Sequence, residues 1–152
     1  MTESALAEGK EFLTEINNAI DRTKNKSWQL MAFLIGIDAY FAKFFIETGQ
    51  NSMVVQMAIF SIPISLAMFY FLSKAMLPIE TRLNGCEPRK IKQIISNNYL
   101  ENMAHTIQKS IDFNTEIHSK ITKKYVISLV LMVIFLIGTI SIFLFNVFTQ
   151  CC

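Results

Sequence analysis

The chain has 152 residues, of which 52% are hydrophobic and 17% are charged, and its formal net charge is +2. A net charge this small argues neither for nor against nucleic acid as a partner. Most of the apolar residues are gathered in three long runs, whereas a soluble domain of this length would distribute them by helix or strand period. The composition therefore argues against a soluble domain and predicts an all-α membrane protein with three transmembrane helices.

The chain begins with a polar segment, residues 1–26, that is predicted to form a cytosolic amphipathic helix. Its apolar residues recur at spacings of three, four or seven: Leu6, Leu13, Ile16 and Ile20. No Pro or Gly stands between Lys10 and Leu34. The helix is therefore expected to continue without a break into the first apolar run.

Three apolar runs reach the roughly 20 residues that a helix needs to cross a bilayer. They are residues 27–46, 53–76 and 125–148. The first two form a transmembrane hairpin, and the second contains Pro63, which a membrane helix tolerates. The third run has no ionisable side chain. Residues 149–152 are a short tail.

The polar segment between the second and third runs, residues 77–124, is predicted to be a cytosolic helical extension. It opens with the turn-forming sequence LPIETRLNGCEPRK, and the short basic helix PRKIKQIISNN follows. A long amphipathic helix is then expected from Tyr99 to Lys124, with no breaker before the third run. Because each amphipathic helix needs a partner for its apolar stripe, we expect a helical bundle that is completed by homo-oligomerisation.

Orientation follows from the basic residues, which are concentrated in residues 1–26 and 77–124. The short connection ETGQNS and the tail TQCC contain no Lys or Arg. The positive-inside rule therefore predicts a multi-pass protein with a cytosolic N-terminus. The basic residues Arg82, Arg89, Lys90 and Lys92 lie close to the second run. Their plainest role is to set this orientation, and they would also suit the phosphate of an anionic lipid or a nucleotide.

The stretch FLIGIDAYFAKFF places Asp38 near the middle of the first run. An ionised acid at this depth is costly, so it usually faces a bundle interior or a water-filled path. One interpretation is a ring of identical Asp38 residues around a cation-selective pore. The other is a protonated Asp38 that hydrogen-bonds to Gln56, Ser61 or Ser65 of the second run and holds the helices together.

The opposite side of this helix carries small residues that suit close helix packing, Ala32, Gly36 and Ala39. Lys43 follows on the same side. It is expected to pair with Glu47, four residues further on, near the outer boundary of the membrane.

Motifs of catalysis are absent from the sequence. There is no glycine-rich phosphate loop, and His105 and His118 are too far apart along one helix to share a metal ion. We therefore expect a protein that is not an enzyme and that holds no metal or cofactor.

The order of these segments resembles a known family. An entry ending DRTKNKSWQLMAFLIGIDA precedes two close spans. An exit LPIETRL follows them, then the polar sequences YLENM and IDFNTEI, and then the entry KITKKYVISLVLM into the last span. This arrangement resembles the transmembrane effectors of bacterial anti-phage cyclic-nucleotide defence, the Pycsar effector family, and the related SLATT-type domains.

The resemblance implies a membrane effector that stays silent until a cytosolic cyclic nucleotide or oligonucleotide signal rises. It would then oligomerise or open and impair the inner membrane, with the synthase of that signal as a functional partner. Two alternatives remain open. The chain could be a small membrane adaptor that anchors a cytosolic partner, or an autonomous pore similar to a holin or toxin.

Overall fold

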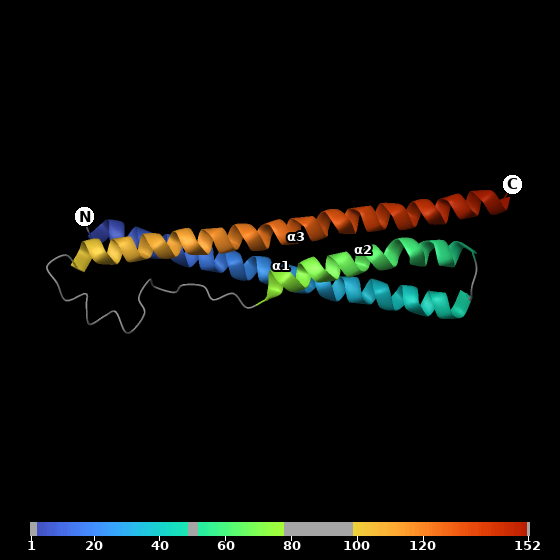
Figure 1. Cartoon of the computed structure of the whole chain (residues 1–152), viewed down its shortest axis with the longest axis horizontal. Helices are drawn as coiled ribbons and strands as arrows, with labels where there is room; N and C mark the ends of the chain where they lie inside the picture. The colour runs from blue at the N-terminus through green and yellow to red at the C-terminus, as the bar shows by residue number, and fades with distance from the viewer. Residues whose placement is uncertain (1–2, 49–51, 78–98, 152) are drawn as a thin grey trace. The chain divides into compact units, whose positions relative to one another are not determined.

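The computed structural model describes residues 3–48, 52–77 and 99–151. They form three helices, α1 (Glu3–Thr48), α2 (Ser52–Met76) and α3 (Tyr99–Cys151) (Figure 1). The prediction of an all-α chain with three long apolar helices is confirmed. α1 and α3 each continue past the point where a polar segment meets an apolar run, as the absence of a breaker predicts. The predicted basic helix at residues 88–98 lies outside the described residues, as do Arg82, Arg89, Lys90 and Lys92.

The chain divides into two compact units, and α1 and α3 contribute to both. The first unit comprises residues 1–24 and 78–122, and the second comprises residues 25–77 and 123–152. All the apolar runs belong to the second unit.

In the first unit, the buried apolar side chains of α1 lie on the stripe predicted for residues 1–26, and those of α3 recur at helical spacing. The buried residues are Leu13 and Ile20 on α1 and Ile107, Ile117 and Ile121 on α3. The two helices approach closely at Gly9, where a Cβ atom would lie 3.2 Å from the Cγ2 atom of Ile107. Ile16, which the sequence placed on the same stripe, is only partly buried.

A polar pair interrupts this apolar stripe. The Nδ2 atom of Asn114 on α3 donates a hydrogen bond of 2.8 Å to the Oδ1 atom of Asn17 on α1. Asn114 is fully buried, and it stands seven residues from both Ile107 and Ile121. A buried Asn in a seven-residue repeat fixes the register of packed helices, because a shifted register leaves its amide without a partner.

The second unit packs α2 against the membrane parts of α1 and α3 (Figure 1). Its core cluster is Met31, Leu34, Met68, Leu72 and Met132. The buried positions of α2 include a strict seven-residue repeat, Val54, Ser61, Met68 and Ala75. A repeat of seven keeps one seam of the helix against its neighbours and is typical of left-handed packing.

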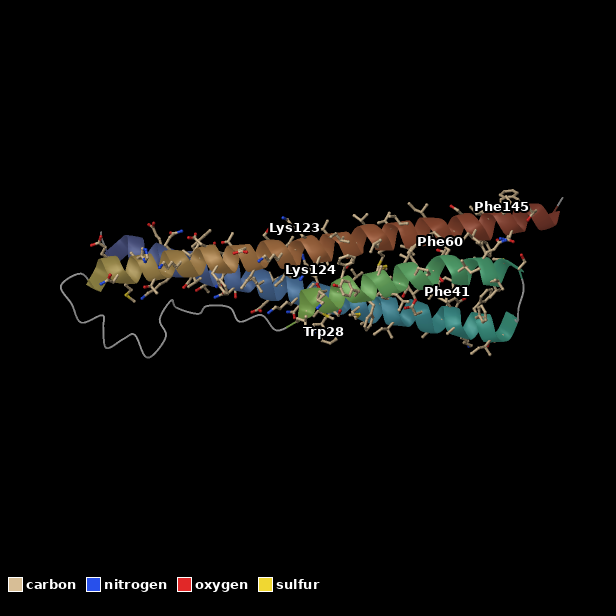
Figure 2. The ribbon with its side chains drawn as sticks, viewed as in Figure 1. Trp28, Phe41, Phe60, Lys123, Lys124 and Phe145 are labelled. Carbon is tan, nitrogen blue, oxygen red and sulfur yellow. The ribbon has the colours of Figure 1, made fainter. Side chains whose placement is uncertain are left out.

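Two aromatic contacts tie α3 to its neighbours in the second unit, and both involve residues labelled in Figure 2. Phe41 of α1 meets Phe135 of α3 edge to face, with ring centroids 5.9 Å apart. The ring of Phe60 on α2 covers Gly138 of α3 so closely that a Cβ atom there would lie 2.1 Å from two ring atoms. Gly138 is therefore a packing glycine.

All three helices are long and apolar enough to cross a membrane, which indicates a multi-pass membrane protein. Trp28, Lys123 and Lys124 lie toward one end of the second unit and Phe145 toward the other (Figure 2). Trp and Lys are typical of the boundary between headgroups and hydrocarbon. In the most apolar stretch of each helix, only 11% to 28% is buried within the chain. The remaining apolar surface needs lipid or another protein chain to cover it.

Candidate intramembrane site

Of the polar residues predicted to interact within the first two apolar runs, Asp38 and Ser65 are in contact. Ser65 of α2 donates a hydrogen bond of 2.5 Å from its Oγ atom to the Oδ2 atom of Asp38 on α1. Ser61 lies one helical turn before Ser65, and both serines are buried. Of the three partners predicted for Asp38, Ser65 is the one that the structure provides.

Asp38 lies in a groove between α1 and α2 that forms a pocket of about 350 Å³. The pocket is mostly apolar, and Asp38, Ser61 and Ser65 are its polar residues. Its other walls come from Phe41, Ala42, Phe44, Phe45, Val54, Met57, Ala58, Ile62 and Leu66. Phe41 follows Asp38 by three residues, and Phe45 follows Phe41 by four. The three side chains therefore lie on one side of α1.

Asp38 is nevertheless exposed at the surface of the chain. An acid at the bilayer centre costs roughly 2.5–3.5 kcal/mol on insertion scales, and one serine hydroxyl offsets only part of this cost. The site is therefore chemically incomplete in a single chain surrounded by hydrocarbon. It requires water, a ligand or another polypeptide against the open side of the groove.

The other predicted residues lie elsewhere in the second unit. The Nδ2 atom of Asn146 on α3 donates a hydrogen bond of 3.2 Å to the Oε1 atom of Gln56, so Gln56 joins α2 to α3. Lys43 pairs with Glu47 at 3.7 Å, as predicted, and both side chains are well exposed. Such an exposed pair adds little stability.

A second groove runs between α1 and α3. It is lined by small residues of the face predicted for close packing, Ala32 and Gly36, and also by Tyr40, Phe135 and Thr139. A Cβ atom at position 36 would meet nothing within 4 Å. This small-residue face is therefore open in the single chain.

Two features of the spans went unpredicted from the sequence. The Asn146–Gln56 pair could have been sought from its two amide side chains, one in the second apolar run and one in the third. The contact between Phe60 and Gly138 had no signal beyond the glycine itself, because any of the aromatic residues of α2 could have covered it. Among the described residues there is no group of three or more metal-binding side chains that could hold an ion.

No protein-family model matches the chain, and neither a curated protein nor a solved structure does.

Proposed function

We propose that the chain is a homo-oligomeric membrane effector that permeabilises or depolarises the bacterial inner membrane when a cytosolic nucleotide signal is made during phage infection. The observation that carries the membrane part of this proposal is the exposed Asp38 carboxyl group in the middle of an apolar helix. A carboxyl group at this depth usually faces a bundle interior or water. Assembly of several copies would supply both.

The small share of apolar surface buried within one chain supports the same assembly. Hydrocarbon can cover exposed Leu, Ile and Phe side chains at no cost, but it cannot solvate Asp38. Oligomerisation would remove the acid from lipid and gather several acids around one axis. Rings of acidic side chains favour cations in channels.

The proposal of a nucleotide signal rests on the resemblance of the sequence to the cyclic-nucleotide effectors. The basic residues Arg82, Arg89, Lys90 and Lys92 are the candidates for a phosphate contact. They follow the second span, on the side that the positive-inside rule assigns to the cytosol. A signal bound there would act on the segment that joins the second span to the long helix α3.

Dye leakage from liposomes that carry the purified protein tests this function. Cyclic mononucleotides, cyclic di- and trinucleotides and short oligonucleotides are added one at a time to protein-containing and protein-free liposomes. We expect leakage with one class of nucleotide and none with the others. Leakage without any nucleotide would favour an autonomous pore, and absence of leakage under every condition would favour a membrane adaptor.

A further inference from the structure

Tyr40 of α1 is placed where a tyrosine is unusual. Tyr and Trp in membrane helices gather at the two interfaces, where the ring is apolar and the polar tip meets water. Tyr40 instead lies two residues from Asp38, in the middle of the span, and its residue surface is 68% exposed. Among the described residues, no hydrogen-bond partner is found for its hydroxyl group. Both polar groups at this depth of α1 are therefore incompletely satisfied in one chain.

The two residues lie on nearly opposite sides of α1. Two helical positions correspond to about 200° of rotation, so Tyr40 cannot turn into the pocket that contains Asp38 of its own chain. The structure agrees, because Asp38 lines the groove between α1 and α2 whereas Tyr40 lines the groove between α1 and α3. Two complementary surfaces on opposite sides of one subunit are what a head-to-tail contact requires.

The two residues also lie at nearly the same depth. Two residues of a helix rise by only about 3 Å. Both side chains lean toward the helix N-terminus, and the longer side chain of Tyr40 reaches further in that direction than that of Asp38. In copies that share one orientation in the membrane, Tyr40 of one copy and Asp38 of the next therefore stand at matching heights.

We propose that Tyr40 of one copy enters the pocket between α1 and α2 of the next copy and donates its phenolic hydrogen bond to Asp38. The apolar walls of this pocket accommodate the ring, and its polar residues, Asp38, Ser61 and Ser65, meet the hydroxyl group. A carboxyl group bonded to Ser65 through Oδ2 keeps further acceptor capacity. Repetition of a head-to-tail contact forms a ring when the rotation between successive copies closes. This inference rests on the homo-oligomer of the proposed function and names its interface.

Photo-crosslinking of the full chain in its membrane tests the contact. Position 40 is changed from Tyr to p-benzoylphenylalanine, which keeps a large aromatic side chain and reacts with adjacent C–H bonds on illumination. The matched control carries the same change at Tyr70, another exposed tyrosine of the spans. Equal amounts of isotopically light and heavy chains are co-expressed, so that adducts between copies contain both labels.

We expect a crosslinked dimer from position 40 whose mixed-label adduct maps to the pocket residues of α1 or α2, and no such adduct from position 70. Adducts to lipid alone, within one chain, or to another face of a second copy would overturn the proposal. In a separate measurement, Tyr40→Phe removes only the hydroxyl group and is expected to weaken subunit association by about fivefold, as the loss of one intramembrane hydrogen bond does. Tyr70→Phe is expected to leave association unchanged. Equal association of the wild type and Tyr40→Phe would overturn the hydrogen bond.

The same membranes are used for the leakage experiment, which separates the two proposals. The expected adduct without nucleotide-dependent leakage would retain this interface and reject the proposed function. Leakage without the adduct would retain the function and reject this interface.

Discussion

Ser65 on α2 donates its hydroxyl hydrogen to Asp38 on α1, with 2.5 Å between the Oγ and Oδ2 atoms. The two residues are 27 positions apart in the chain, so this bond joins α1 to α2. Ser65 is only 8% exposed, whereas Asp38 is open to the surface of the chain. The buried Ser65 therefore orients the Asp38 carboxyl group through its Oδ2 atom, and the exposed part of this group faces whatever covers the groove.

Ser65→Ala removes this bond while leaving the helix intact, since Ala is a good helix former. We expect a loss of about 1 kcal/mol in the free energy of unfolding, which lies between the average and the largest values for hydrogen bonds between membrane helices. Reversible unfolding in mixed micelles measures it. Ser141→Ala is the control, because Ser141 bonds only to the carbonyl of Ile137 in its own helix. Equal stability of the two variants would mean that the Asp38 bond contributes nothing.

The sequence predicted much of the fold because the signals were long. Runs of about twenty apolar residues specify helices by length alone, and the absence of breakers between residues 10 and 34 predicted that α1 would be continuous. The site was harder to predict. Asp38 was identified from its cost in hydrocarbon, and three partners were possible because Gln56, Ser61 and Ser65 all lie on the second span. The choice of Ser65 depends on how far α2 slides along α1, which is a packing property.

Gly138 is predicted to tolerate substitution less well than Gly36. A Cβ atom at position 138 would meet two atoms of the Phe60 ring at 2.1 Å, whereas at position 36 it would meet nothing within 4 Å. Gly138→Ala should therefore destabilise the packing of α2 against α3 by about 1–3 kcal/mol, and Gly36→Ala should be neutral or slightly stabilising in the monomer. Thermal unfolding in one detergent compares the two variants.

The cause of the Gly138 effect can be checked with a second change. Phe60→Ala removes the ring that occupies the space. Combined with Gly138→Ala, it should remove most of the additional loss, which a double-mutant cycle measures. Additive effects of the two changes would show that the Phe60 ring is not the cause of the loss in Gly138→Ala.

The buried pair Asn17–Asn114 predicts a non-additive response in the first unit. Asn114→Leu leaves the amide of Asn17 facing an apolar side chain, so it should lower the free energy of unfolding by about 1–3 kcal/mol. The double variant with Asn17→Leu and Asn114→Leu should recover that loss, because two apolar groups replace two polar ones. Chemical denaturation of the four proteins completes the cycle. A double variant less stable than Asn114→Leu would contradict this account.

Glu116 and Lys120 predict a small pH dependence in the part of α3 that precedes the third apolar run. The Lys120 Nζ atom donates a hydrogen bond of 2.6 Å to the Glu116 Oε1 atom, and this bond, with the charge of Lys120, lowers the pKa of Glu116 below 4.5. A lowered pKa in the folded state stabilises the fold above pH 4.5, and that contribution is lost as the pH falls through the folded value. Because Glu116 is fully exposed, the effect should be visible in its own titration rather than in global stability.

Carbon-13 NMR of the Glu116 carboxyl group follows this titration directly. Lys120→Ala should raise the midpoint to about 4.5, the value of the unperturbed group. Lys109→Ala, which removes a charge from the same helix without touching Glu116, should leave the midpoint unchanged. An identical midpoint in the wild type and Lys120→Ala would show that the pair does not persist in solution.

Asp38 should be the residue on which nucleotide-dependent leakage depends most. Asp38→Ala removes both the charge and the acceptor atoms, so Ser65 loses its partner and the open side of the groove loses its polar group. We expect roughly a tenfold fall in leakage, which corresponds to about 1.4 kcal/mol in assembly or ion entry. Asp38→Asn keeps the size and one acceptor oxygen for Ser65 but removes the charge. A cation path therefore predicts a similar fall in this variant, whereas a role in assembly alone predicts leakage within about twofold of the wild type. An equal fall in both variants would assign the effect to the charge and hence to an ion path. Unchanged leakage in Asp38→Ala, at normal expression, would remove Asp38 from the mechanism.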